Sequence, residues 1–142
     1  MEILTTSELK IYIENLFDKL RPFKEEKSCY ALFDIKFSEG TKMSGDFCYS
    51  DGQHYYYGGM DDRGKVTSEE FDNLFDLTYA IFEFQTQGLA FDYARNHRVA
   101  QHDPRRIAFP RQIELIRIIG EEYAQKLEQE IEGILKEYPY RD

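Results

Sequence analysis

The clearest signals for helix starts and ends in the chain lie in the C-terminal stretch DPRRIAFPRQIELIRIIGEEYAQKLEQEIEGILKEYP, residues 103–139. Asp103 followed by Pro104 predicts a helix N-cap and a first helical residue, because the N–H that proline lacks is unpaired at that position in any helix. Gly120 predicts the end of this helix, since glycine accepts the backbone conformations found at helix C-termini. A last helix follows and ends before Pro139.

Two capping boxes predict two further helices. In this motif a Ser or Thr side chain accepts a hydrogen bond from the backbone N–H three residues later, and a Glu at that position reciprocates. Thr5-x-x-Glu8 precedes apolar residues at helical spacing and predicts a helix that ends near Pro22. Thr67-x-x-Glu70 predicts a second helix of about 30 residues, which reaches His97.

Between the two capping boxes the sequence alternates with the period of two that is typical of strands. Residues 28–37 predict one strand, and residues 46–50 and 53–57 predict two more, joined by the hairpin signal Asp51-Gly52. The short connections favour an antiparallel meander, with room for a fourth strand in residues 58–66. We therefore expect an α+β fold with an N-terminal helix, a three- to four-stranded antiparallel meander and a helical C-terminal half, which contains the long helix and two or three more.

Length and composition favour a single domain over residues 1–142, because 42% of the residues are hydrophobic and 32% are charged. No apolar run is long enough to cross a bilayer, and the N-terminus lacks the pattern of a secretory leader. We therefore expect a cytoplasmic protein. Cys29 and Cys48 fall in neighbouring predicted strands and are expected to be free thiols, although the sequence leaves open whether they are close enough to pair.

The charge of the chain is strongly negative and unevenly distributed. A formal net charge of −9 disfavours nucleic acid and anionic membranes as partners and favours a basic protein. Between Arg95 and Arg111, however, five arginines accompany one aspartate. We interpret this segment as a connector that neutralises the ends of neighbouring acidic helices.

No residue pattern predicts catalysis or a cofactor. Gly59–Phe71 has the order of a calcium-binding EF-hand loop, but a glycine and an arginine occupy ligand positions, so we interpret it as a turn followed by a capping box. The three histidines share no metal-ligand spacing, and neither cysteine has a histidine nearby. We expect no catalytic residue, no cofactor and no metal. One alternative function is a small hydrolase that uses a cluster of carboxylates such as Asp61 and Asp72.

Tyrosines and aspartates gather in the predicted hairpin and its ends. Strand alternation places Tyr55 and Tyr57 on one sheet face and Tyr56 on the other, with Tyr49 across the hairpin. Tyrosine is enriched at binding hot spots, and aspartates suit a basic partner, but such rings equally well cover a small core. The residues that we expect to contact a partner are Tyr49, Asp51, Tyr55, Tyr56, Tyr57, Asp61 and Asp62, with Asp46 at the same strand ends.

A set of residues in the C-terminal half has a recognisable order: Phe75-Asp76-Leu77 and Phe82, then Asp103, Arg105, Arg106, Phe109, Gln112, Glu114, Leu115, Ile131, Leu135 and Pro139. This order resembles that of bacterial immunity proteins from polymorphic-toxin systems, specifically the immunity protein 63 family. The similarity runs from Thr67 to Pro139 and is strongest after Asp103.

The resemblance implies a protein that binds and neutralises one cognate toxin domain and is not an enzyme. Many such toxins are nucleases with basic clefts, which an acidic protein can occlude. Asp103, Arg105 and Arg106 then form a structural motif, in which we expect Asp103 to cap its helix and Arg106 to pair with a carboxylate of the long helix. The alternative function is an acidic protein-binding or regulatory module outside toxin defence.

Overall fold

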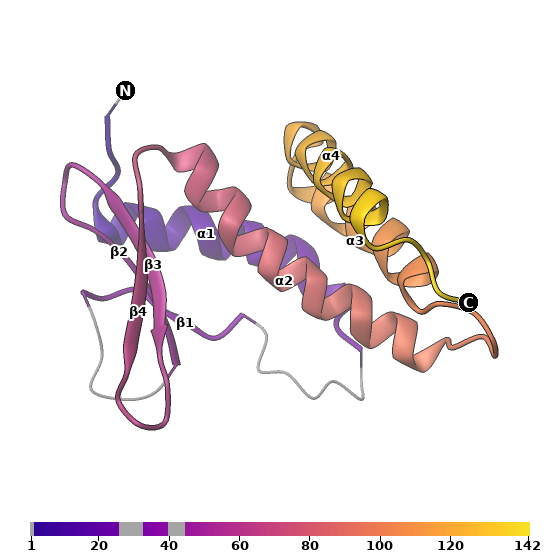
Figure 1. Ribbon diagram of the computed structural model, residues 1–142. Coiled ribbons are helices and arrows are strands. Elements are labelled where there is room, and N and C mark those ends of the chain that lie inside the picture. The colour runs from indigo at the N-terminus through magenta and orange to yellow at the C-terminus, as the bar shows by residue number, and fades with distance from the viewer. Residues whose placement is uncertain (1, 26–32, 40–44) are drawn as a thin grey trace. The chain divides into compact units, whose positions relative to one another are not determined.

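The computed structural model describes residues 2–25, 33–39 and 45–142 (Figure 1). The elements are α1 (Thr6–Leu20), the short 3-10 helix η1 (Arg21–Phe23), β1 (Ile35–Lys36), β2 (Gly45–Ser50), β3 (Tyr55–Met60), β4 (Val66–Phe71), α2 (Leu74–Asn96), α3 (Arg105–Ile119) and α4 (Glu121–Glu137). The expected α+β class, with an N-terminal helix, a sheet and a helical second half, is confirmed.

The chain forms two compact units. The first takes its described residues from Met1–Phe17 and Phe33–Ile81, and the second takes them from Asp18–Leu32 and Phe82–Asp142. The sheet, most of α1 and the first part of α2 belong to the first unit. The rest of α2 belongs to the second, together with α3 and α4.

Helix α1 begins as the first capping box predicts. The Glu8 backbone N–H donates to the Thr5 hydroxyl at 3.2 Å, and the Thr5 N–H donates to the Glu8 carboxylate at 3.0 Å. The apolar residues Leu9 and Ile13 lie four apart on one face of the helix and are fully buried. The helix ends two residues before Pro22, which cannot continue it.

The sheet has the order β1-β2-β3-β4. Strands β2, β3 and β4 form the expected antiparallel meander, but β1 pairs with β2 in parallel, so the sheet is mixed and the prediction of a purely antiparallel one is wrong. Of the predicted strand 28–37 the structure describes residues 33–37, and among these Ile35 and Lys36 belong to the sheet. A two-residue strand makes few ladder bonds, and Phe33 just before it packs edge-on against Phe17 of α1, with ring centroids 4.9 Å apart, so this contact also holds the segment.

The second capping box is not formed, because Thr67 and Glu70 lie in β4 and pair with β3. Sheet pairing outweighs the local motif, and the fourth strand is therefore at Val66–Phe71 rather than within residues 58–66. Helix α2 begins at Leu74 and is capped by Asn73, whose side-chain carbonyl accepts the Asp76 N–H at 2.8 Å. The Asn73 side-chain amide also donates to the Asp76 carboxylate at 3.0 Å, so a second bond, between the two side chains, supports this cap.

The inner face of the sheet contributes to the core of the first unit. Cys48, Tyr55 and Phe71 are buried there. The Leu4 N–H donates to the Tyr55 hydroxyl at 2.8 Å, and the Ser50 N–H donates to the Thr6 hydroxyl at 3.0 Å, so the sheet is tied to the start of α1. Burial raises the pKa of the Cys48 thiol to about 12. Cys29 lies outside the described residues, so the structure does not test whether Cys29 and Cys48 are close enough to pair.

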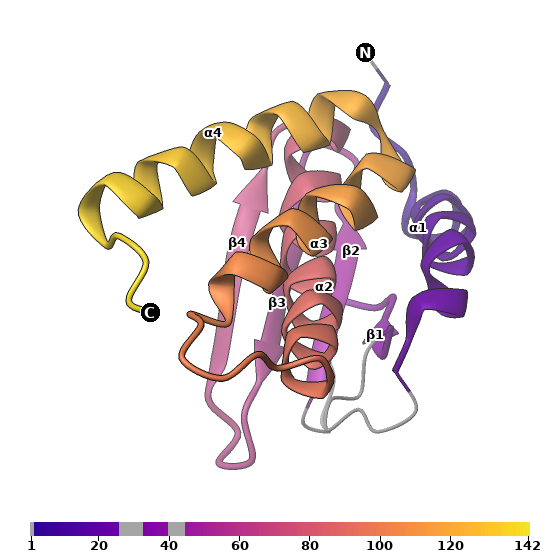
Figure 2. The same cartoon turned by 90° about the vertical axis from the view of Figure 1, so that its right-hand side faces the viewer.

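The second unit is helical. Helices α3 and α4 pack against each other as a hairpin (Figure 2), joined by Gly120, at which a Cβ would come within 2.9 Å of the Tyr123 ring. Helix α3 runs on through Pro110, where the sequence predicts a kink or a restart. The buried Gln112 amide donates to the backbone carbonyl of Glu83 in α2 at 3.0 Å. No helix among the described residues is long and apolar enough to span a membrane.

Two glycines offer a direct test of this packing. At Gly58 in β3 an added Cβ would overlap the backbone carbonyl of Thr67 and lie 2.7 Å from the Ser68 Cα in β4. We expect Gly58→Ala to lower the free energy of unfolding by about 1–3 kcal/mol, because backbone cannot move aside cheaply. Urea unfolding followed by circular dichroism measures the change.

The matched control is Gly133→Ala in α4, where an added Cβ meets no atom within 4 Å. Alanine is a better helix former, so this variant should gain roughly 0.5–1 kcal/mol. Equal effects of the two substitutions would contradict the close approach of β3 and β4.

Candidate functional site

The sheet places one cluster of polar and aromatic side chains on its outer face, opposite Cys48 and Tyr55. The register pairs Tyr49 with Tyr56, and Tyr56 with Glu70. Asp51, His54 and Asp72 lie just beyond the strand ends, and the contacts that link them to Tyr56 and Glu70 place them on this same side. We call these six residues the outer patch: Tyr49, Asp51, His54, Tyr56, Glu70 and Asp72.

The turn between β2 and β3 is held by Asp51. Its carboxylate accepts the N–H groups of Gln53 at 2.9 Å and His54 at 2.8 Å, an arrangement typical of aspartate at turns. These bonds, with that of His54 first, lower the pKa of Asp51. The turn is centred on Gly52 and Gln53, so β3 starts at Tyr55 rather than at the predicted Gln53.

The Tyr56 hydroxyl joins two carboxylates of the outer patch. It lies 3.0 Å from Asp51 Oδ2 and 3.0 Å from Glu70 Oε1. The hydroxyl has one proton to donate, so these acceptors compete for it. Hydrogen bonding to Asp51, and then to Glu70, raises the pKa of Tyr56.

Stacked rings give the outer patch an apolar component. The Tyr49 and Tyr56 rings stack with centroids 4.8 Å apart, and Tyr49 also stacks on Phe47 at 6.1 Å. Both tyrosines are half-buried. A flat aromatic surface bordered by carboxylates can accept an arginine or lysine side chain through both charge and ring contact.

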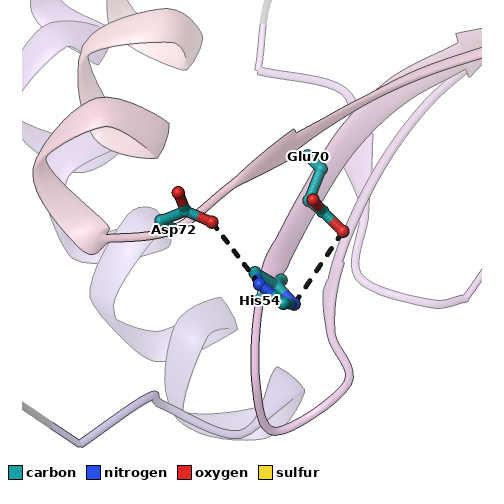
Figure 3. Close-up of side chains that lie close together, drawn as sticks. All are labelled: His54, Glu70 and Asp72. Atoms are coloured by element: carbon teal, nitrogen blue, oxygen red, sulfur yellow. Dashed lines mark ion pairs between the residues drawn. The ribbon is translucent and has the colours of Figure 1, made fainter.

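His54 lies between two acidic residues, as Figure 3 shows. Its Nε2 atom is 3.4 Å from Asp72 Oδ1, and its Nδ1 atom is 3.8 Å from Glu70 Oε1. Sequence reasoning misses these three residues as a group because it assigns Thr67 onward to a helix. Gly52 and Gly64 both mark turns in the sequence. Interpreted as two successive hairpins, these turns could have predicted that His54, Glu70 and Asp72 meet.

The outer patch carries uncompensated negative charge. Within the described part of the chain, no lysine or arginine lies within 4.0 Å of the carboxylates of Asp51, Glu70 or Asp72. His54 is the one ion-pair partner that Glu70 and Asp72 have there, and it is charged only when protonated. This part of the surface therefore attracts a cation.

The other residues expected to contact a partner lie elsewhere. Tyr55 is only 1% exposed, and Tyr57 follows it on the inner face. Asp61 and Asp62 lie beyond the far end of β3, roughly 20 Å along the strand from the outer patch. The Asp61 carboxylate accepts the N–H groups of Arg63 and Lys65, both at 2.9 Å, so the EF-hand-like segment begins as a hairpin turn.

A second surface feature is an open depression at this far end, with a volume of about 380 Å³. Its lining residues are Asp46, Gly59, Met60, Asp61, Lys65 and Thr67. Burial, and then the charge of Asp34, raises the pKa of Asp46. Asp46 and Asp61 thus face a different surface from Asp51, and the strand-end aspartates do not form one cluster.

Asp103 caps α3 as expected. Its carboxylate accepts the backbone N–H of Arg105 at 2.9 Å and pairs with the Arg105 guanidinium at 2.8 Å. It also accepts the N–H of Arg141 at 2.7 Å, which ties down the C-terminal segment. These bonds, that from the Arg105 side chain first, hold the pKa of Asp103 well below its usual range.

The prediction that Arg106 pairs with a carboxylate of the long helix is wrong. Its guanidinium pairs with Asp142 at 2.8 Å instead of a carboxylate of the long helix, because the segment after Pro139 folds back over the start of α3. The guanidinium also lies 4.3 Å from the centre of the Tyr140 ring. The connector is neutralised locally in the same way at the end of α2, where Arg95 pairs with the fully buried Asp92 at 2.8 Å.

The fold and the outer patch define a class of protein that presents an acidic, aromatic surface on a small α+β scaffold. A family model described as Immunity protein 63 matches residues 51–133, more than half of the chain. The chain therefore belongs to the immunity protein 63 family, which confirms the resemblance. The match includes the hairpin of β3 and β4, upstream of where the residue order suggested the similarity begins. No curated protein and no solved structure matches the chain.

Asp103 makes stability depend on pH in a defined direction. Its pKa is lower in the folded chain than in the unfolded chain, so it stabilises the fold above its ordinary pKa of about 4, and this contribution is lost as the pH falls through the folded pKa. We expect Asp103→Asn to lower the melting temperature at pH 7, and the difference from the parent to shrink below about pH 4. Thermal unfolding at pH 7, 5, 4 and 3 measures this.

Asp62→Asn, in the exposed turn after β3, is the control and should leave the pH profile parallel to that of the parent. A difference for Asp103→Asn that stays constant from pH 7 to pH 3 would show that the carboxylate contributes no charge-dependent stability.

Proposed function

We propose that this protein is a cytoplasmic immunity protein that binds a cognate toxin domain, such as a basic nuclease, and neutralises it by occluding its active site. Membership of the immunity protein 63 family is the observation that carries the proposal. It acts by binding and not by catalysis, and the outer patch is its contact surface.

The charge of the chain supports a basic target. The net charge of −9 speeds encounter with a positively charged surface. The outer patch concentrates three carboxylates, one on β4 and two just beyond strand ends, where no lysine or arginine of the described residues neutralises them. A lysine or arginine of the toxin would gain charge-assisted hydrogen bonds there.

The aromatic part of the outer patch supports a protein partner in particular. Tyr49 and Tyr56 are already stacked on each other, so little rotamer freedom is lost when a partner covers them. The Asp51 and Glu70 carboxylates fix the Tyr56 hydroxyl. A preorganised ring of this kind is typical of interface hot spots.

Co-expression with the toxin encoded by the neighbouring gene tests the function. We expect the chain to restore growth of cells that make the toxin, and the purified proteins to form a complex whose association rate falls as salt is raised. Absence of protection together with absence of a complex would contradict the proposal and favour a regulatory module outside toxin defence.

Single substitutions test the contact surface. We expect Tyr56→Ala to weaken toxin binding at least about tenfold, because it removes the central ring of the outer patch. Glu70→Gln should mainly slow association, since it removes charge and keeps shape. Surface plasmon resonance measures both rates.

The matched control is Tyr138→Ala, which removes a tyrosine that is 56% exposed at the end of α4. If this control weakens binding and Tyr56→Ala does not, the contact surface lies on the helical unit and the assignment of the outer patch is wrong.

A further inference from the structure

We infer that His54, Glu70 and Asp72 form a binding site for a divalent transition-metal ion of the Zn²⁺ class. Each residue offers one ligand atom, and these atoms all lie within 4.8 Å of one another. One imidazole nitrogen and two carboxylate oxygens form a donor set that suits Zn²⁺. Ca²⁺ and Mg²⁺ prefer oxygen donors alone, so the imidazole selects against them. The inference concerns the chain without a partner and does not rest on the proposed function.

The backbone brings the three ligands together. The strand pairing ends at Tyr55 and Phe71, and His54 and Asp72 are the next residues beyond that pair, with their side chains 3.4 Å apart. Glu70 lies at the end of β4 and Asp72 just after it, and both carboxylates approach the His54 ring. Figure 3 shows the two carboxylates on either side of the His54 ring. The end of the β3–β4 pairing thus brings the three ligands together.

One of the ligand separations already matches that of a metal site. Zn²⁺ binds nitrogen and oxygen at about 2.1 Å, so two ligand atoms on one tetrahedral ion are roughly 3.4 Å apart. His54 Nε2 and Asp72 Oδ1 are 3.4 Å apart already. The Glu70 Oε1 atom lies 3.8 Å from the other ring nitrogen, Nδ1, and accepts the Tyr56 hydroxyl, so this carboxylate has to rotate away from Tyr56 to reach the ion, and its 53% exposed side chain leaves room for that.

The remaining polar atoms can complete the site. One ring nitrogen of His54 binds the ion. The other can donate its N–H to a carboxylate oxygen that does not bind the ion, and such a hydrogen bond is usual for a metal-bound histidine. Water fills the fourth position, because the Asp72 side chain is 83% exposed. The ion would also relieve the repulsion between Glu70 and Asp72, for which the described part of the chain supplies no lysine or arginine within 4.0 Å.

Isothermal titration of the tag-free chain with ZnCl₂ tests the inference. We expect one saturable site per chain, lost or weakened at least roughly tenfold in His54→Ala and also weakened in Asp72→Asn. MgCl₂ and CaCl₂ should show no comparable binding. The melting temperature should rise with ZnCl₂ in the parent chain and not in His54→Ala, because an ion that binds only the folded state stabilises it.

His97→Ala is the control. His97 is exposed beyond the end of α2, where its ring stacks on Tyr93 at 4.0 Å. This variant should bind Zn²⁺ as the parent does. Far-UV circular dichroism establishes that each variant is folded. No saturable binding to the parent, or binding to His54→Ala with unchanged affinity, would overturn the inference.

Discussion

The antiparallel register of β2, β3 and β4 is the constraint on which both faces of the sheet depend. Two turns establish it, one closed by the Asp51 carboxylate and the other by Asp61, with Gly64 at a φ of 81°. A shift of one residue would exchange the faces, placing Tyr55 in solvent and Tyr56 in the core. The turns thus determine which aromatic residues stabilise the fold and which remain available to a partner.

The two faces use the same residue types for different purposes. On the inner face, the Tyr55 ring is buried and its hydroxyl is bonded to the start of α1, so this tyrosine stabilises the unit. On the outer face, the Tyr56 hydroxyl contacts two carboxylates that are themselves exposed. Negative charge that would be costly to bury is kept in solvent and close to aromatic surface, which is the chemistry that a basic protein surface or a metal ion would neutralise.

The family motif has a structural role in the second unit. The Asp103 carboxylate accepts a backbone N–H of the first turn of α3. Together with Arg105 and Arg106, Asp103 fixes the segment after Pro139. The residue order of this motif therefore identifies the family because these residues stabilise the scaffold. The surface proposed to act on a partner lies in the other unit, and the family match covers all of its residues except Tyr49.

The sequence by itself determined the elements whose signals are local. The capping box at Thr5, the Asp103-Pro104 start and the Gly120 break each depend on atoms within a few residues, and all three appear as expected. Only the tertiary structure decided β4, because the bonds that Val66–Phe71 makes with β3 outweigh a capping box of the same residues. The parallel direction of β1, the partner of Arg106 and the meeting of His54 with Glu70 and Asp72 were decided in the same way, since each depends on contacts between segments far apart in the chain.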